Sequence, residues 1–180
     1  MGLEFCPVET DGQIEELAEM AAQIWGEYWP SIIGQDQTDY MVEKFQSVEA
    51  ITRDLREHNY RYWVLREQDG HAVGFTGGAV EEMSDDPVHN SLIHHSDVID
   101  EKWPRRFFIS KIYLYKSERG KHYASRVIEF YEKLCRDEGF PVMYLTVNRG
   151  NELGIRAYLG RGFEIVDEVD SPIGHGFVMN

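Results

Sequence analysis

The residues that most clearly carry chemistry lie in a short segment between an apolar stretch and an amphipathic one. Residues 107–115 are rich in aromatic and β-branched side chains, which predicts a strand, and residues 124–135 carry apolar side chains at helical spacing. The segment between them reads Arg119-Gly120-Lys121-His122-Tyr123-Ala124. Such a loop directs its backbone N–H groups and the positive end of the following helix toward one point, where a phosphate group is stabilised. The sequence therefore predicts a phosphate-binding loop.

A second candidate is the histidine and carboxylate cluster between residues 83 and 106. Imidazole and carboxylate groups both ligate metals, which raises the possibility of a metal site. The segment has no apolar periodicity and contains prolines, and a loop of this length in a compact domain is usually functional or mobile. We favour a solvated insertion near the substrate and expect no metal. The metal ligands considered are Asp85, Asp86, His89, His94, His95, Asp97 and Asp100.

Hydrophobic periodicity predicts the elements that would position the phosphate-binding loop. Asp69-Gly70, between two aromatic and β-branched runs, indicates a tight hairpin, and Thr10 with Gln13 indicates a capping box at a helix start. The expected strands are residues 3–8, 60–67, 72–82, 107–115, 142–147, 163–169 and 174–179, and the expected helices begin near Thr10, Tyr40, Ser47, Gly120 and Asn151.

This order of elements predicts an α/β (α+β) fold. The simplest packing is a mixed central β-sheet of about seven strands with helices on both faces. A chain of 180 residues falls within the usual range for one domain, and no linker or internal repeat divides it. We therefore expect a single domain over residues 1–180.

The chain is strongly acidic, with 18 Lys and Arg residues against 32 Asp and Glu residues and a formal net charge of -14. Nucleic-acid binding through phosphate neutralisation requires a basic face, which this composition does not readily supply, so we expect no nucleic-acid partner. The acidity is compatible with solubility alone or with a cationic partner or substrate.

Cysteine usage and hydropathy bear on the compartment. Cys6 and Cys135 are the only cysteines and have no CxxC spacing, so neither a zinc site nor a disulfide framework is indicated. The N-terminus has neither the basic nor the apolar region of a signal peptide, and no run approaches the ~18 apolar residues of a membrane span. We expect a soluble cytoplasmic protein with no membrane partner.

Two motifs in order resemble those of the GNAT superfamily of N-acetyltransferases. Arg119 to Ala124 resembles the R-G-x-G-x-G/A pyrophosphate loop of that family, and it follows the strand segment Ile112-Tyr113-Leu114 at the appropriate distance. The second motif resembles the family's N-x-x-A-x-x-x-Y-x-x-x-G-F segment, with tighter or shifted spacing; its residues are Asn148, Asn151, Ala157, Tyr158, Gly162, Phe163 and Glu164. The resemblance implies a GNAT fold and acetyl-CoA as co-substrate.

The resemblance also implies roles for particular residues. The backbone of Ile112, Tyr113 and Leu114 would pair with the pantetheine arm, and Asn151 would hydrogen-bond the cofactor. His122 stands where the family loop has its middle glycine, a position at which the absence of Cβ favours close approach of the backbone. The remaining cofactor-binding candidates are Arg119, Gly120, Lys121, His122, Tyr123, Ala124, Ser125, Asn148 and Ala157.

For the reaction, the resemblance implies direct attack of an amine on the thioester in a ternary complex. Tyr158 would be the general acid, because a phenol with a pKa of about 10 can protonate the departing thiolate. The amine must also lose a proton, through a carboxylate, a water chain or desolvation, and the sequence does not identify the base. The carboxylates considered, as bases or for acceptor binding, are Glu27, Glu43, Glu81 and Glu82.

The acceptor is left as a set of alternatives. Residues 29–51 and 174–179 look similar to bacterial spermidine/spermine acetyltransferases, so a polyamine is one reading of a small-molecule primary amine. A protein or peptide amine, and a non-catalytic module that binds acetyl-CoA or a partner, are the others, and a homodimer stays open. The acceptor-binding candidates are Trp25, Glu27, Tyr28 and Glu81. An aromatic wall for an amine could be formed by Trp25, Tyr28, Trp29 and Trp103. Packing of these rings in the core and at its rim is the simpler reading.

Overall fold

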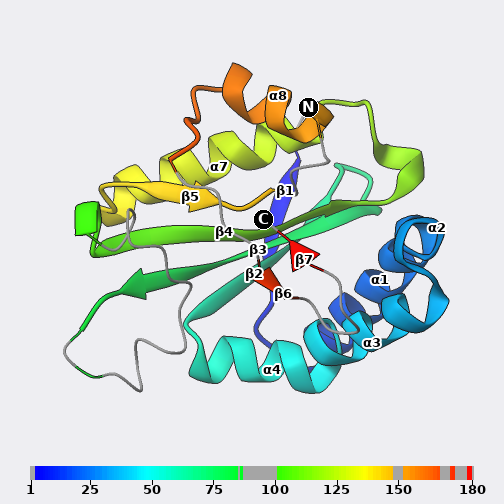
Figure 1. The fold of residues 1–180 in the computed structure, drawn as a ribbon. Coiled ribbons are helices and arrows are strands. Elements are labelled where there is room, and N and C mark those ends of the chain that lie inside the picture. The colour runs from blue at the N-terminus through cyan, green and yellow to red at the C-terminus, as the bar shows by residue number, and fades with distance from the viewer. Residues whose placement is uncertain are drawn as a thin grey trace.

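A computed structural model of the chain describes residues 3–84, 86, 101–147, 152–166, 171–172 and 178–179. Helices lie on both faces of a central sheet, with α1–α4 on one face and α7 and α8 on the other (Figure 1). The described elements are β1 (Glu4–Pro7), α1 (Asp11–Tyr28), α2 (Pro30–Ile33), α3 (Gln35–Phe45), α4 (Val48–Glu57), β2 (Tyr60–Arg66), β3 (Ala72–Glu82), β4 (Arg105–Leu114), the 3-10 helix η1 (Lys116–Glu118), α7 (Tyr123–Glu138), β5 (Met143–Leu145), α8 (Glu152–Gly160), β6 (Ser171–Pro172) and β7 (Val178–Met179).

The central sheet has the strand order β1-β2-β3-β4-β5. Its neighbours are antiparallel except β4 and β5, which are parallel, so the predicted mixed sheet with helices on both faces is confirmed. The predicted strand count differs, because five strands form this sheet and β6 and β7 pair separately. The strand expected at residues 163–169 is wrong over its described part, since residues 163–166 are irregular.

Alternation along the strands builds a hydrophobic core on each face of the sheet. Tyr62 and Val64 of β2 pack on the face covered by α1, whereas Trp63 and Leu65 pack on the face covered by α7. A strand buried on both sides reads as a continuous apolar run rather than an alternating one, which explains its sequence. The two cores fix the sheet between its helical layers.

Local signals determine where the elements begin and end. The Thr10–Gln13 capping box at the start of α1 is present as predicted, and the Ser47 hydroxyl accepts a hydrogen bond from the Ala50 N–H at the start of α4. Gly139 ends α7 in the left-handed conformation. The predicted hairpin turn is also present, with Gly70 at a φ of 91° between β2 and β3.

One irregularity in β4 matters for the site. Gly77 of β3 pairs with Lys111 and Gly78 pairs with Ile109, so Ser110 is an extra residue and forms a β-bulge. On its other side, β4 pairs with β5 only from Phe107 to Ile109. The β5-facing edge of β4 from Ser110 to Leu114 is therefore paired with no described strand. Among the described helices, none is long and apolar enough to cross a membrane.

Candidate active site

The loop between β4 and α7 presents an exposed, uncapped helix N-terminus. Residues 119–122 are exposed, and Gly120 has a φ of 82°. His122 occupies the N-cap position in the left-handed conformation (φ 65°, ψ 21°), and its side chain makes no capping hydrogen bond to α7. The first N–H groups of a helix have no intrahelical acceptor, and they stabilise an anion placed before them. This geometry suits the phosphate group expected from the sequence.

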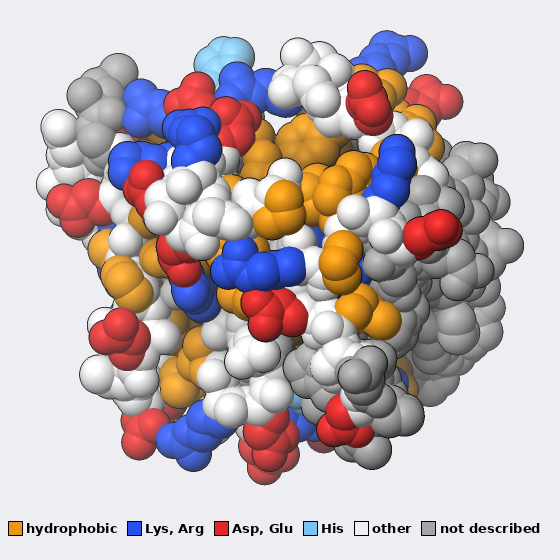
Figure 2. Space-filling model, turned by 90° about the vertical axis from the view of Figure 1, so that its left-hand side faces the viewer, with side chains coloured by type: hydrophobic (Ala, Val, Ile, Leu, Met, Phe, Trp, Pro, Cys, Tyr) orange, Lys and Arg blue, Asp and Glu red, His pale blue; other side chains and the backbone are white. Residues whose placement is uncertain are grey.

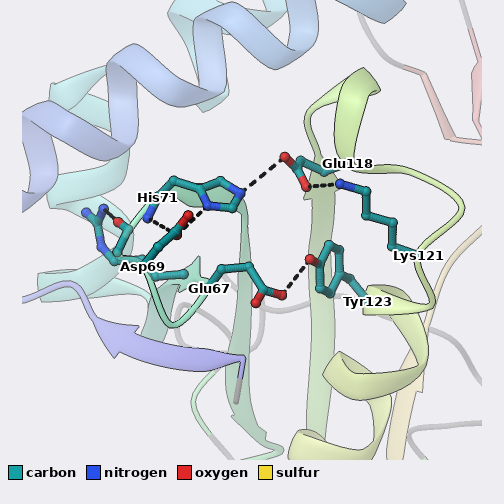
Figure 3. Close-up of polar contacts among 8 residues, drawn as sticks. Glu67, Asp69, His71, Glu118, Lys121 and Tyr123 are labelled. Carbon is teal, nitrogen blue, oxygen red and sulfur yellow. Dashed lines mark hydrogen bonds and ion pairs between the residues drawn. The ribbon is translucent and has the colours of Figure 1, made fainter. Parts of the chain in front are cut away.

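The tip of the β2–β3 hairpin contacts the same loop (Figure 3). His71 lies between two carboxylates, with Nδ1 2.5 Å from Asp69 Oδ1 and Nε2 3.3 Å from Glu118 Oε1. Glu118 also accepts a hydrogen bond from Lys121 Nζ at 3.0 Å, and Tyr123 Oη donates to Glu67 at 2.5 Å. We call these residues the hairpin clasp. The hairpin clasp contacts both ends of the loop between β4 and α7.

Hydrogen bonds within the hairpin clasp shift the pKa values of its side chains. The hydrogen bond to Asp69, with a further contribution from Glu118, raises the pKa of His71, and the hydrogen bond from Lys121 lowers the pKa of Glu118. The hydrogen bond to Glu67 raises the pKa of Tyr123 to about 12. Sequence reasoning missed this cluster, because its partners lie up to 56 residues apart and no local motif links them.

Tyr158 lies on α8 and is half-buried. Its ring packs edge to face on Phe163, with centroids 5.7 Å apart, and contacts the core on the α7 face. Burial raises the pKa of Tyr158, and burial followed by the proximity of Tyr158 raises the pKa of Tyr113 on β4. The structure thus brings Tyr158 close to β4, the strand with the unpaired edge. Both phenols stay protonated at neutral pH.

Arg161, which follows the last turn of α8, connects α8 to α7. The Arg161 guanidinium lies 3.5 Å from the Ser125 carbonyl oxygen and 3.5 Å from a Glu129 carboxylate oxygen. Ser125 belongs to the first turn of α7, so the contact sets Tyr158 relative to the phosphate-binding loop. Ala157, beside Tyr158, is exposed. Asn148 and Asn151 lie outside the residues that the structure describes.

The acceptor-binding candidates occupy different places. Trp25 is buried, its ring lies 5.5 Å from that of Tyr113, and its indole N–H has no hydrogen-bond partner among the described residues. Glu27 accepts a hydrogen bond from the Lys116 N–H at 2.8 Å, which connects α1 to η1. The side chain of Tyr28 is not described. The structure therefore places Trp25 and Glu27 beside the end of β4.

Glu81 lies elsewhere, inside a buried polar cluster. Its carboxylate accepts hydrogen bonds from Arg106 Nε at 3.0 Å and from Tyr144 Oη at 2.5 Å. Arg106 is fully buried and Glu81 nearly so. These contacts connect β3, β4 and β5 where β4 and β5 are still paired. Of the other base candidates, Glu43 is exposed on α3 and Glu82 forms an exposed ion pair with Arg105.

A further polar cluster beside the bulge escaped the sequence analysis. Tyr60 Oη donates to Ser110 Oγ at 3.1 Å, and Lys111 Nζ donates to Tyr62 Oη at 2.6 Å. Tyr62 in turn donates to Asp54 at 2.7 Å. Burial lowers the pKa of Lys111 to about 8, against the opposing effect of Asp54, and burial raises the pKa of Tyr60 to about 12. The bulge therefore carries polar groups on the face covered by α3 and α4.

The candidate metal ligands of the 83–106 segment cannot be placed, because all except Asp86 fall outside the described part of the chain. Asp86 is exposed, and its N–H donates to Ser84 Oγ at 3.2 Å. Trp103 of the proposed aromatic wall is half-buried, and Lys102 Nζ lies 5.2 Å from its ring centroid. Trp29 packs on Trp25, with ring centroids 5.3 Å apart.

Comparisons with known proteins place the chain among acetyltransferases. Residues 16–163 match the acetyltransferase (GNAT) family. A comparison with curated proteins finds no match.

Solved structures share the fold at low sequence identity. The PaiA N-acetyltransferase of Thermoplasma acidophilum, in complex with coenzyme A, is 17% identical with a TM-score of 0.67, and the match covers 99% of this chain and 98% of that one. A GCN5-related N-acetyltransferase of Ralstonia eutropha JMP134 is 19% identical with a TM-score of 0.65 over 95% and 98% of the two chains. A transcriptional regulator of Bacillus halodurans C-125 is 16% identical with a TM-score of 0.63 over 93% and 97%.

Proposed function

The chain belongs to the acetyltransferase (GNAT) family and is an acetyl-CoA-dependent N-acetyltransferase, and from that premise we propose that its acceptor is the primary amine of a small molecule, with polyamines the leading class. The amine attacks the thioester directly while both substrates are bound. The net charge of -14 supports this choice, because an acidic protein attracts a polycation from a distance.

The observation that carries the proposal is the succession of a strand edge that no described strand pairs with and a helix N-terminus without a side-chain cap, although the Leu114 carbonyl already accepts from Arg119 Nη2 at 3.3 Å. The β5-facing edge of β4 from Ser110 to Leu114 pairs with no described strand, and His122, the N-cap position of α7, follows eight residues after Leu114. The first suits an extended arm with amide groups, and the second suits a diphosphate. We assign the arm to Ile112, Tyr113 and Leu114 and the diphosphate to residues 119–125; Asn148, Asn151 and Ala157 complete the assignment from the second motif.

His122 fits the assignment through its conformation. The backbone at this position is left-handed, and glycine is the residue that adopts this conformation at least cost. Histidine is among the side chains that tolerate it best. The left-handed conformation of His122 therefore supports the assignment of the diphosphate to this loop.

Tyr158 supplies the proton in this proposal. Expulsion of the thiolate needs a donor within hydrogen-bond reach, and a phenol that is protonated throughout the neutral range can provide one. The support is its half-buried position close to Tyr113 of β4, together with its raised pKa. For the acceptor, the Glu81 carboxylate is already bonded to Arg106 and Tyr144, whereas Trp25 and Glu27 lie beside the C-terminal end of β4, nearest the assigned diphosphate. None of the three is therefore assigned to the reacting amine.

Two measurements test the proposal. Calorimetric titration with acetyl-CoA measures binding, and a free-thiol release assay over polyamines, amino acids and peptides identifies the acceptor class. Arg119→Gln should weaken acetyl-CoA binding by about tenfold, the order expected for one hydrogen bond to a charged group. Arg136→Gln is the matched control, because it removes the same charge from the opposite end of α7.

Other outcomes would point to other functions. Thiol release only with peptides would establish a protein or peptide acceptor and overturn the small-molecule proposal. Binding of acetyl-CoA without thiol release on any amine would favour a module that senses the cofactor. A wild-type protein that does not bind acetyl-CoA would contradict the site assignment altogether.

A further inference from the structure

The bulge in β4 presents a hydroxyl group that the roles assigned so far do not use. Ser110 is the extra residue between Ile109 and Lys111, and it lies where the β4–β5 pairing ends. Bulges interrupt the regular ladder and redirect a side chain, and they are over-represented next to active sites. Ser110 is half-buried rather than sealed in the core, so a bound molecule can reach it.

The hydrogen bonding of Ser110 leaves its own proton available. Tyr60 Oη donates to Ser110 Oγ at 3.1 Å, so the serine oxygen acts as an acceptor in that contact. A hydroxyl group has one donor in addition to its acceptor lone pairs, and no described residue accepts the Ser110 proton. Because burial raises the pKa of Tyr60 to about 12, the Tyr60 phenol keeps its proton over the whole neutral range.

The proposed cofactor assignment determines what lies next to this hydroxyl. The diphosphate is assigned to residues 119–125 and the arm to Leu114, Tyr113 and Ile112, so the cofactor runs backward along β4. The next position along the unpaired edge is the bulge, and β5 closes the edge at Ile109. The thioester at the end of the arm therefore falls beside Ser110. This step rests on the proposed function.

We propose that Ser110 donates a hydrogen bond to the thioester carbonyl oxygen, with Tyr60 as the positioning residue that orients the serine hydroxyl. As the amine nitrogen bonds to the carbonyl carbon, the C=O π pair moves onto oxygen, and the hydrogen bond stabilises that negative charge. When the pair returns, the carbon–sulfur bond breaks and the thiolate takes the proton of Tyr158, while the nitrogen loses one proton, which restores the Tyr158 phenol. Ser110 keeps its own proton throughout.

Infrared difference spectroscopy tests this contact without any acceptor. Acetyl-CoA isotopically labelled at the thioester carbonyl is bound to the wild type and to Ser110→Ala, after calorimetry has established that each protein binds it. A donated hydrogen bond polarises the carbonyl, so its band should lie at lower frequency in the wild type than in Ser110→Ala. Ser117→Ala, which removes an exposed hydroxyl of η1, should match the wild type.

Tyr60→Phe keeps Ser110 in place and removes the group that orients it, so its band should lie between those of the wild type and Ser110→Ala. If Ser110→Ala does not fold, the band of Tyr60→Phe compared with that of the wild type still tests the contact. With an acceptor identified by thiol release, kcat of Ser110→Ala should fall by about 10²-fold with little change in the KM for acetyl-CoA, and Ser110→Thr should recover most of it.

The outcomes separate the two proposals. Equal carbonyl frequencies in the wild type and Ser110→Ala, both binding acetyl-CoA, would overturn the role of Ser110 and leave the proposed function standing. Absence of acetyl-CoA binding by the wild type would overturn both.

Discussion

At the scale of single residues, the site contains groups held in unusual conformations or surroundings. His122 has a φ of 65°, and Asn59 is the other described non-glycine residue with positive φ. Burial raises the pKa of Tyr158 above the ordinary value for a tyrosine side chain. Each feature depends on one residue, so a single substitution tests it.

His122→Gly should stabilise the protein, because glycine adopts the left-handed conformation without the clash that Cβ makes there. The expected gain in the free energy of unfolding is about 1 kcal/mol, less the entropy that glycine adds to the unfolded chain. Urea denaturation measures it. His122→Ala is the control, since it removes the imidazole and keeps the Cβ; a gain of the same size in both variants would contradict the backbone explanation.

Tyr158→Phe should lower kcat by about 10² to 10⁴-fold, the range for loss of a general acid, with little change in acetyl-CoA affinity. The ring and its contact with Phe163 remain, so the fold should be unaffected. Thiol release measures kcat and calorimetry measures affinity. Because the pKa of Tyr158 is raised, its acid form persists above pH 10, so wild-type activity should not fall through Tyr158 titration below that pH. Full activity of Tyr158→Phe would exclude it as the acid.

At the scale of elements, the site depends on contacts between segments that are distant in the chain. The hairpin clasp connects the β2–β3 turn to the loop before α7, and the Glu81–Arg106 pair connects β3 to β4, with Tyr144 adding β5 (Figure 3 shows the clasp). The hairpin clasp positions the loop between β4 and α7, and the Glu81–Arg106–Tyr144 contacts connect the strands where the β4–β5 pairing ends.

The hairpin clasp should make stability depend on pH through His71. Its folded-state pKa lies above the ordinary value of 6.5, so its stabilising contribution is fully present below about pH 6.5 and is lost as the pH rises through the folded-state value. The stability advantage of the wild type over His71→Gln should therefore shrink over that interval. Urea denaturation across the pH range measures the difference, which high salt should also reduce because His71 and Asp69 are exposed. A pH-independent difference would exclude an ionic role.

Arg106→Met should destabilise the protein by about 3–5 kcal/mol, because it leaves the buried Glu81 carboxylate without its cation. The double variant Arg106→Met with Glu81→Leu should recover part of that loss. Arg61→Met, which breaks the exposed ion pair with Glu138, should cost only about 0–1 kcal/mol. Urea denaturation of the set would contradict this account if Arg106→Met and Arg61→Met lost the same amount.

Features encoded by neighbouring residues could be predicted from the sequence, and features that depend on pairing could not. The Thr10 capping box, the Gly70 turn and the α7 start all depend on residues within a few positions of one another. The Ser110 bulge is defined by its register against Gly77 and Gly78, and sequence carries no signal for that register. Likewise, the pattern of residues 163–169 is apolar enough for a strand, but residues 163–166 pair with nothing described.

At the scale of the whole molecule, the two cores share a single five-stranded sheet, and the single domain expected over residues 1–180 stays a prediction. Opposite charges are mixed on the surface. Lys and Arg side chains lie among Asp and Glu side chains on the face shown in Figure 2, although the net charge of the chain is strongly negative. Ion pairs such as Arg105–Glu82 neutralise charge locally. The excess of 14 negative charges acts at longer range.

That excess leads to a prediction about salt. If the acceptor is a polyamine, kcat/KM for it should fall by tenfold or more between about 0.01 M and 1 M ionic strength, because the Debye length shrinks from about 30 Å to about 3 Å and long-range attraction is screened. Initial rates of thiol release at saturating acetyl-CoA measure this dependence. A monoamine of similar length is the control, since one charge gains less from the field than three or four, and its slope should be shallower. Equal slopes for the two acceptors would show that the acidity of the protein serves solubility and not the recruitment of a polycation.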